Sequence, residues 1–233
     1  NLYYGRVDNL FGGGSEAGAT TTNVGLGNGT VNKVFGGSNI SGVVNTSNVE
    51  INAGISDSVY GGNNQGGTTG DTNVYVNGGD INFVYGGGEK TSVTENTNVT
   101  LNGEVNNVFG GSNLEGSVPN SYINVINGGA INIYGGNNSG GTATTTYVVL
   151  NGGSIGNAYA CGYGSQTICD STFILVNGIN SPSGAVYGGG YASKNNSPTN
   201  VVVNKGTIGD VYGGNNNSGV IDESNVYINN GTV

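Results

Sequence analysis

The chain has 233 residues, of which 48 are glycine, three are proline and 8% are charged, and it lacks tryptophan, methionine and histidine. Collagen is excluded because the glycines follow no Gly-X-Y period and proline is scarce. The formal net charge is −9 with five lysines and arginines, so we expect no nucleic acid partner, which would require a basic surface. No run is apolar over the roughly 18 residues that a membrane helix needs, and we expect no membrane insertion.

A repeat runs through the whole sequence and argues against disorder, which a glycine- and asparagine-rich composition would otherwise allow. An aromatic residue followed by two small residues recurs at intervals of 24 or 25 residues, with one interval of 28, at Phe11, Phe35, Tyr60, Tyr85, Phe109, Tyr134, Tyr159, Tyr187 and Tyr212. A hydroxyl residue opens a second motif 11 to 13 residues later, at Thr22, Ser47, Thr72, Thr97, Ser121, Thr146, Thr172, Thr199 and Ser224.

One repeat unit, beginning at Thr72, shows which elements to expect in each. Thr72, Val74 and Val76 alternate with Asn73 and Tyr75, which predicts a half-buried strand over 72–76. Residues 77–79 (Asn-Gly-Gly) form a turn signal, because glycine adopts positive φ without steric cost. A second extended stretch follows over 81–85, and a weaker third side is centred on Val93.

Three short sides in about 25 residues predict one coil of a parallel β-solenoid, so we expect a single all-β domain of about nine coils over residues 1–233. The predicted inward columns are Val24, Val49, Val74, Val99, Val148, Ile174, Val201 and Val226, and Leu26, Ile51, Val76, Leu101, Leu150, Val176, Val203 and Ile228. The coil containing residues 122–126 is read as slipped by one residue, and its inward set is unassigned.

Two further columns are expected to form ladders along the axis. One turn position carries an asparagine in most coils, whose stacked amides can donate and accept hydrogen bonds from coil to coil; its members are Asn52, Asn77, Asn102, Asn151, Asn177, Asn204 and Asn229. The nine aromatic residues can stack in the same way.

The motifs Val-Tyr-Gly-Gly (59–62 and 211–214) and Val-Asn-Gly-Gly (76–79) make the chain resemble bacterial secreted and cell-surface β-helix proteins, a class that includes autotransporter passengers, repeat adhesins and pectate-lyase-like folds. The resemblance covers the whole chain. It implies a right-handed β-helix, because left-handed solenoids of this kind have shorter coils. It also implies an extracellular or cell-surface location and a structural or adhesive role, with a glycan or a host surface as a possible ligand.

The charged residues favour a non-catalytic protein. The seven aspartates and seven glutamates do not repeat in one column, and the adjacent pair Asp222 and Glu223 would point to opposite faces of a strand. We therefore expect no catalytic residues, metal site or cofactor. The alternatives are a polysaccharide-binding or polysaccharide-degrading β-helix and, with less support, an ice-binding solenoid, since the threonine column is predicted to face inward.

The two cysteines, Cys161 and Cys169, both lie in the connection between Tyr159 and Thr172, which is one residue longer than usual. A local disulfide is the favoured interpretation if the protein is secreted, because such bonds persist in oxidising compartments. Two buried, reduced thiols are the alternative.

The outward positions of the first strand become apolar in the later coils. These strands are then continuous apolar runs, a pattern typical of strands that are buried on both faces. We expect an interface there, formed by Tyr147, Val149, Phe173, Leu175, Val202 and Tyr227. Either the chain's own segment 180–185 or another molecule could provide the cover.

Both ends of the sequence fall inside a repeat. Val7 and Leu10 match the second side of a coil, and residues 229–233 reach the turn before another second side. We therefore expect end-to-end self-association into a fibre, or a longer parent chain that continues the array.

Overall fold

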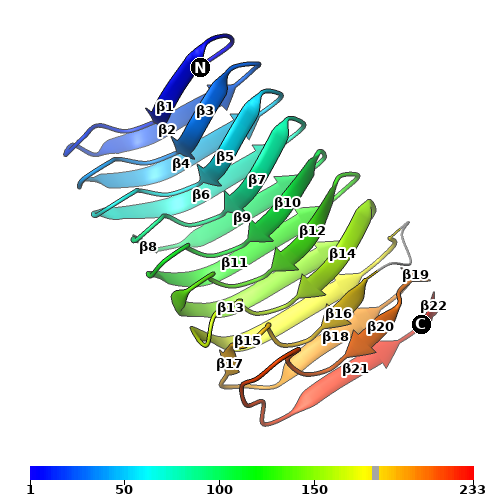
Figure 1. The fold of residues 1–233 in the computed structure, drawn as a ribbon. Coiled ribbons are helices and arrows are strands. Elements are labelled where there is room, and N and C mark those ends of the chain that lie inside the picture. Colours follow the sequence, from blue (N-terminus) through cyan, green and yellow to red (C-terminus); the bar gives the residue numbers. More distant parts are fainter. Residues whose placement is uncertain (180–183) are drawn as a thin grey trace.

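The computed structural model describes residues 1–179 and 184–233, and every regular element in these two stretches is a β-strand. The strands form two long parallel sheets that face each other, and the chain alternates between them as it advances (Figure 1). Paired residues are 24 or 25 positions apart through most of the chain, as are Val24 with Val49 and Phe35 with Tyr60. The protein is therefore a parallel β-solenoid of about nine turns of about 25 residues.

The first long sheet has nine strands, in the order β1 (Arg6–Phe11), β3 (Thr30–Phe35), β5 (Ile55–Tyr60), β7 (Asp80–Tyr85), β10 (Glu104–Phe109), β12 (Gly129–Tyr134), β14 (Ser154–Tyr159), β16 (Ala185–Tyr187) and β20 (Asp210–Tyr212). The facing sheet has eleven strands. Its main path is β2 (Ala19–Leu26), β4 (Val43–Ile51), β6 (Thr68–Val76), β9 (Asn96–Leu101), β11 (Ser117–Val125), β13 (Gly140–Leu150), β15 (Gln166–Val176), β18 (Thr199–Val203) and β21 (Ser224–Ile228), and β8 (Ser92–Val93) and β17 (Lys194–Asn195) pair with β6 and β15.

The predicted third side forms no separate sheet in residues 1–179 and 184–233, so this expectation was wrong. In most coils the segment around the position of Val93 is the first half of a strand of the eleven-stranded sheet, as in β4. Asn45 and Thr46 of that strand both turn outward between the buried Val44 and Ser47. Two consecutive outward residues interrupt the alternation of the strand, and yet the pairing with the next coil continues on both sides of them. The coil therefore has two sides.

A two-stranded sheet of β19 (Gly206–Thr207) and β22 (Gly231–Thr232) lies near the C-terminal end. Thr207 stands five residues before Tyr212, as Asp80 stands before Tyr85. β19 and β22 therefore correspond to the first residues of a strand in the nine-stranded sheet. Residues 208 and 209 separate β19 from β20.

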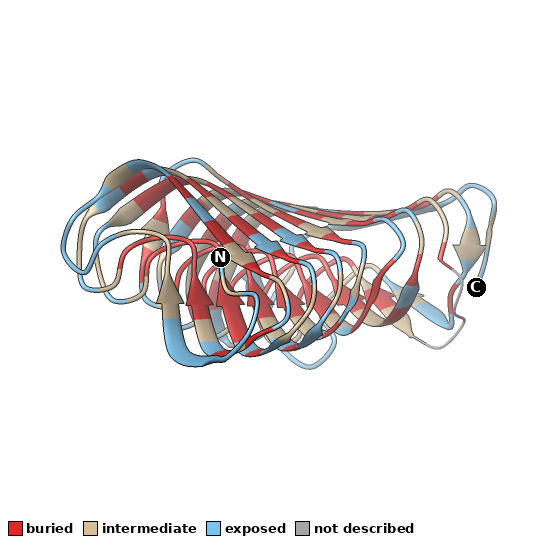
Figure 2. Cartoon of the chain, turned by 90° about the horizontal axis from the view of Figure 1, so that it is seen from above, coloured by how far each residue is buried: buried red, intermediate tan, exposed pale blue. Residues whose placement is uncertain are grey.

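The interior is a stack of aliphatic side chains between the two sheets. Figure 2 shows buried positions recurring from strand to strand. Both predicted inward columns of the eleven-stranded sheet are buried as far as Val201 and Val203. Val226 and Ile228 are 40% and 48% exposed, because β21 is the last strand of its sheet.

The coil that was read as slipped is in register. Ile123 and Val125 are buried and pair with Val148 and Leu150 of the next coil. The irregularity is confined to the turn, where Ile126 follows the strand in place of the usual asparagine.

The hydroxyl column lies inside the solenoid and joins the two sheets. Its first eight members are at most 3% exposed. The Thr72 hydroxyl donates a 2.7 Å hydrogen bond across the interior to the Gly86 carbonyl, just after the aromatic residue of the facing strand. Ser121 does the same to Gly135 at 2.6 Å. The same bond recurs from Thr22, Thr97, Thr146, Thr172 and Thr199.

The nine aromatic rings form the stacked ladder that the sequence predicts. Neighbouring ring centroids are 4.6 to 5.1 Å apart and the ring planes diverge by 6 to 12°. The rings form a cluster separate from the aliphatic interior. Asn113 and Asn216, from the loops that follow the aromatic motif, donate hydrogen bonds to the hydroxyls of Tyr60 and Tyr159.

Burial makes the ladder sensitive to alkaline pH. Loss of hydration, with the nearby charge of Glu89, raises the pKa of Tyr60 from 10.0 to about 12. Burial also raises the pKa of Tyr85 and of Tyr134. A phenolate within the ladder would lose most of its hydration, which disfavours the charged form. The folded state therefore holds the phenolic protons more tightly than the unfolded chain does.

The hydroxyl column offers a matched pair of substitutions. Ser121→Ala removes the donor to the buried Gly135 carbonyl, and we expect the free energy of unfolding to fall by about 1–3 kcal/mol. Ser47 is equally buried, but its hydroxyl has no hydrogen-bond partner, so Ser47→Ala should change stability little. Urea unfolding followed by circular dichroism measures both. Equal losses for the two variants would contradict a stabilising role for the cross-sheet bond.

The ladder should also set the alkaline limit of stability. Above pH 10 the unfolded chain loses phenolic protons that the folded state retains, so the free energy of unfolding should decrease as the pH rises from 10 to about 12. An absorbance titration of tyrosinate, recorded with circular dichroism, tests this. The ladder phenols should ionise together with unfolding, later than the exposed ones. Ionisation of all tyrosines near pH 10, with the fold intact, would show that the ladder is accessible to water.

Candidate binding surfaces and the disulfide

One outward column of the eleven-stranded sheet changes character along the axis. In the first coils it consists of asparagines whose amides donate to one another at 3.0 to 3.1 Å, from Asn98 through Asn73 and Asn48 to Asn23. The next three coils carry Tyr122, Tyr147 and Phe173 in the same register. These rings stack at centroid distances of 5.0 and 5.1 Å. The column returns to asparagine at Asn200 and Asn225.

An apolar hollow lies beside this short aromatic stack. The neighbouring outward column aligns Val149, Leu175 and Val202 on successive coils. Together with Tyr147 and Phe173 they line a hollow of about 250 Å³, which Asn200 also borders. We call these five residues, extended by Tyr122 and Tyr227, the apolar face.

The structure therefore brings all six predicted interface residues onto one side of one sheet. Phe173 is 37% and Tyr227 is 56% exposed, and the other four are partly buried. Tyr122, 38% exposed, was missed because its coil had been left unassigned. The segment that could have covered this face, 180–185, lies mostly outside the described residues, and only Gly184 and Ala185 are described.

The outer side of the nine-stranded sheet carries a hollow of about 660 Å³. Asp80 and Glu104 line it from successive coils, next to Ile131 and Gly156. A smaller hollow of about 220 Å³ shares Asp80 and is lined also by Arg6 and Asp57. Asp80 and Glu104 are exposed. A carboxylate oxygen of Glu104 lies 3.2 Å from where a Cβ atom on Gly129 would stand, and so it extends toward the following coil.

A second pair of carboxyl groups, Asp71 and Glu95, was not predicted because the two residues belong to different coils. A hydrogen bond to Asp71, and then the charge of Asp71, raise the pKa of Glu95. Asp71 also accepts a 2.9 Å hydrogen bond from the Asn96 amide. Glu95 is exposed. Within residues 1–179 and 184–233 no three histidine, cysteine, aspartate or glutamate side chains gather as a metal site would require.

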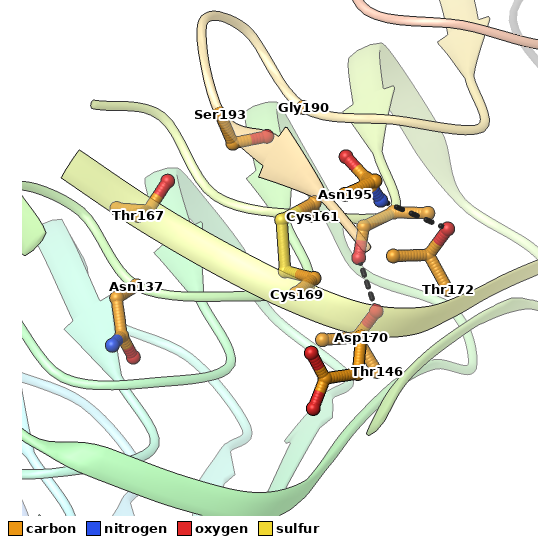
Figure 3. The surroundings of a disulfide bond; sticks show 12 residues. Asn137, Thr146, Cys161, Thr167, Cys169, Asp170, Thr172, Gly190, Ser193 and Asn195 are labelled. Carbon is orange, nitrogen blue, oxygen red and sulfur yellow. Dashed lines mark hydrogen bonds between the residues drawn. A yellow bond between two sulfur atoms is a disulfide. The ribbon is translucent and has the colours of Figure 1, made fainter. Parts of the chain in front are cut away.

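Cys161 and Cys169 form a disulfide in the interior (Figure 3). Cys161 occupies the second position after Tyr159, and Cys169 lies on β15 at the inward position that Ala143 holds in the preceding coil. Both half-cystines are fully buried and pack with Ala143. Asn195 of the following coil pairs with Cys169.

The disulfide stands where other coils use a buried amide. In the coil before it, Asn137 accepts a hydrogen bond from the Ser112 amide at 2.8 Å and donates to the carbonyls of Gly116 and Gly140, both at 3.0 Å. Gly162 takes the place of that asparagine in the next coil and has no side chain to do so. The disulfide therefore links the two parts of this coil at the turn where the Asn137 side chain links them by hydrogen bonds in the preceding coil.

The predicted asparagine ladder at the turn is also present. Amide hydrogen bonds of 2.7 to 3.0 Å run from Asn102 through Asn77 to Asn52, and from Asn229 through Asn204 and Asn177 to Asn151. In the coil with the irregular turn, Asn151 donates instead to Asn124. These amides and the inward threonines form hydrogen bonds along the scaffold. The threonines of the hydroxyl column face inward, and their hydroxyls therefore do not form a row on the surface.

Comparison of the chain with models of protein families, with curated protein sequences and with solved structures found no match. The described residues also contain no helix of the length and hydropathy that a membrane span requires.

Proposed function

We propose that the protein is an extracellular structural or adhesive β-solenoid without catalytic activity, and that it self-associates through the apolar face. The observation that carries this proposal is the change within one outward column from hydrogen-bonded asparagines to stacked aromatic rings. The scaffold does not need this change, because the same strands keep the same register in both parts. A solvent-facing apolar patch on a regular scaffold is typical of an interface.

A second copy of the chain is the partner that the face fits best. Its two outward columns contain no charged residue from Tyr122 to Tyr227, so two copies can approach without burying an unpaired charge. The face belongs to a sheet, and two sheets can pack face to face at about 10 Å with their side chains interleaved. The net charge of −9 opposes association elsewhere on the surface, so the apolar face would have to supply the attraction.

The disulfide supports the extracellular assignment. Disulfides persist in secreted and cell-surface proteins and are reduced in most cytosols. Cys161 and Cys169 are completely buried, and a bond in that position serves the packing of the coil rather than exchange with a dissolved thiol.

Sedimentation velocity over a range of protein concentrations tests the self-association. We expect Phe173→Ser with Leu175→Ser to weaken it while circular dichroism stays unchanged. The matched control is Asn98→Ser with Thr100→Ser, which changes the same two columns in the polar coils and should have no effect. Raising the salt concentration should strengthen association, because screening reduces the repulsion between acidic chains. A wild-type protein that stays monomeric at high concentration would overturn the proposal.

A polysaccharide-processing function is the second candidate, favoured by the position of Asp80 and Glu104 in the hollow outside the nine-stranded sheet. Two carboxyl groups that flank a glycosidic bond can act as acid and base. The proposed function predicts that purified protein releases no new reducing ends or unsaturated products from a panel of soluble polysaccharides. Product release that Glu104→Gln abolishes, with the fold retained, would establish the enzyme instead.

A further inference from the structure

Tyrosine is the side chain through which this protein would react with one-electron oxidants. The chain has 14 tyrosines and no tryptophan, methionine or histidine. Its two cysteines are joined in a buried disulfide and offer no thiol. The usual competitors for oxidation, methionine and free cysteine, are therefore missing. A one-electron oxidant that reaches the protein will oxidise a tyrosine side chain.

One pair of phenols lies in the loops that follow the aromatic motif and faces solvent. Tyr163 and Tyr191 each follow a glycine in the loops of successive coils, and their rings stack with centroids 4.8 Å apart and planes 18° apart. Tyr163 is 43% exposed and Tyr191 is partly buried. In other coils this position carries asparagine, as at Asn113 and Asn138.

The surroundings hold the two rings in place. Tyr163 meets the ladder ring of Tyr134 edge-on at 5.5 Å, and Tyr191 meets Tyr159 edge-on at 6.3 Å. The loop backbones are joined as well, because the Tyr191 amide donates to Gly162 and the Ala192 amide donates to Tyr163, both at 3.0 Å. The pair is thus pre-aligned by both side-chain and backbone contacts, which lowers the entropic cost of bringing two rings together.

The other stacked tyrosines are less available, except Tyr212, which is 46% exposed and stacks on the partly buried Tyr187 at the end of the ladder. Tyr134 and Tyr159 are 5% and 3% exposed, so a bulky oxidant cannot reach them directly. Tyr122 and Tyr147 are stacked and partly exposed, but they lie on the face proposed to self-associate. Tyr75 is 44% exposed and stacks on no other described aromatic ring.

We propose that Tyr163 and Tyr191 are a site of dityrosine formation when the protein meets a haem peroxidase and hydrogen peroxide. Each phenol loses one electron and one proton to give a phenoxyl radical. The two radicals couple through a carbon–carbon bond between ring carbons ortho to the oxygens. Each of these carbons then loses its proton, and each phenol oxygen is protonated again. In total the protein loses two hydrogen atoms, and one hydrogen peroxide is reduced to two waters.

The bond would join two coils where the solenoid is least regular. It would bridge the interval of 28 residues between Tyr159 and Tyr187 on the outside, while the disulfide closes the same region on the inside. A crosslink between two loops restricts the unfolded chain, so the oxidised protein should melt at a higher temperature than the untreated protein.

The test uses the full chain, diluted so that links within one molecule dominate, and treated with horseradish peroxidase and hydrogen peroxide. We expect dityrosine fluorescence, with mass spectrometry of a proteolytic digest showing Tyr163 and Tyr191 peptides joined with the loss of two hydrogens. Tyr163→Phe and Tyr191→Phe keep the stacked rings but should each remove the fluorescence. Tyr75→Phe is the control for an exposed, unstacked phenol and should leave the yield unchanged.

The proposal is overturned if Tyr163→Phe gives the wild-type yield with its fold intact by circular dichroism. It is also overturned if the link maps to Tyr122 and Tyr147, or if the yield per molecule rises in proportion to protein concentration, since the link would then join different molecules. None of these outcomes depends on self-association through the apolar face.

Discussion

The structure depends on one constraint: each residue lies over its equivalent in the preceding coil, because parallel strands about 4.8 Å apart pair in register. Each column must therefore consist of side chains that interact favourably with a side chain of the same kind in the next coil. Valine and isoleucine pack, asparagine both donates and accepts, aromatic rings stack, and inward hydroxyls bond to the facing sheet. Charges do not tolerate copies, since two like charges about 5 Å apart repel by about 3 kcal/mol at an effective dielectric constant of about 20. This accounts for a chain with only 8% charged residues, and its one ion pair among the described residues, between Lys33 and Glu89, joins two different columns.

The same constraint explains the glycine that follows most of the aromatic residues. A Cβ atom on Gly61 would lie 2.3 Å from the Gly86 carbonyl oxygen of the next coil and 2.9 Å from the Cβ of Thr72. Close approach of backbones, rather than a positive φ, excludes a side chain there. The approach also places the carbonyl within reach of the hydroxyl on the facing strand. Aromatic residue, glycine and threonine are thus three parts of one arrangement, which is why they recur together at a fixed spacing.

The sequence was sufficient to predict the features that repeat. The period, the inward columns, the asparagine turn and the aromatic ladder all follow from spacing, because a β-strand has a period of two and a coil a period near 25. Features that join different columns could not be predicted in the same way. The pair Asn45 and Thr46 looks like the end of a strand in the sequence, since two polar residues interrupt the alternation, but the strand pairing continues on both sides of it. The edge contacts of Tyr163 and Tyr191 depend on how loops fold over the ladder, which no spacing reveals. The six residues of the predicted interface do share one face, because that prediction used only strand alternation.

Register also gives the proposed surfaces their form, because it converts residues that are 24 to 28 positions apart into a stack of rings or a row of amides. Cysteine pairs test it most directly. Asn48 and Asn73 are in register on adjacent strands, with the amide of Asn73 donating to Asn48 at 3.0 Å, so Asn48→Cys with Asn73→Cys should form a disulfide readily on mild oxidation. Asn48→Cys with Tyr75→Cys places the thiols on a diagonal and should not. Efficient bonding of the diagonal pair, with none between the in-register pair, would contradict the stacking on which the whole account rests.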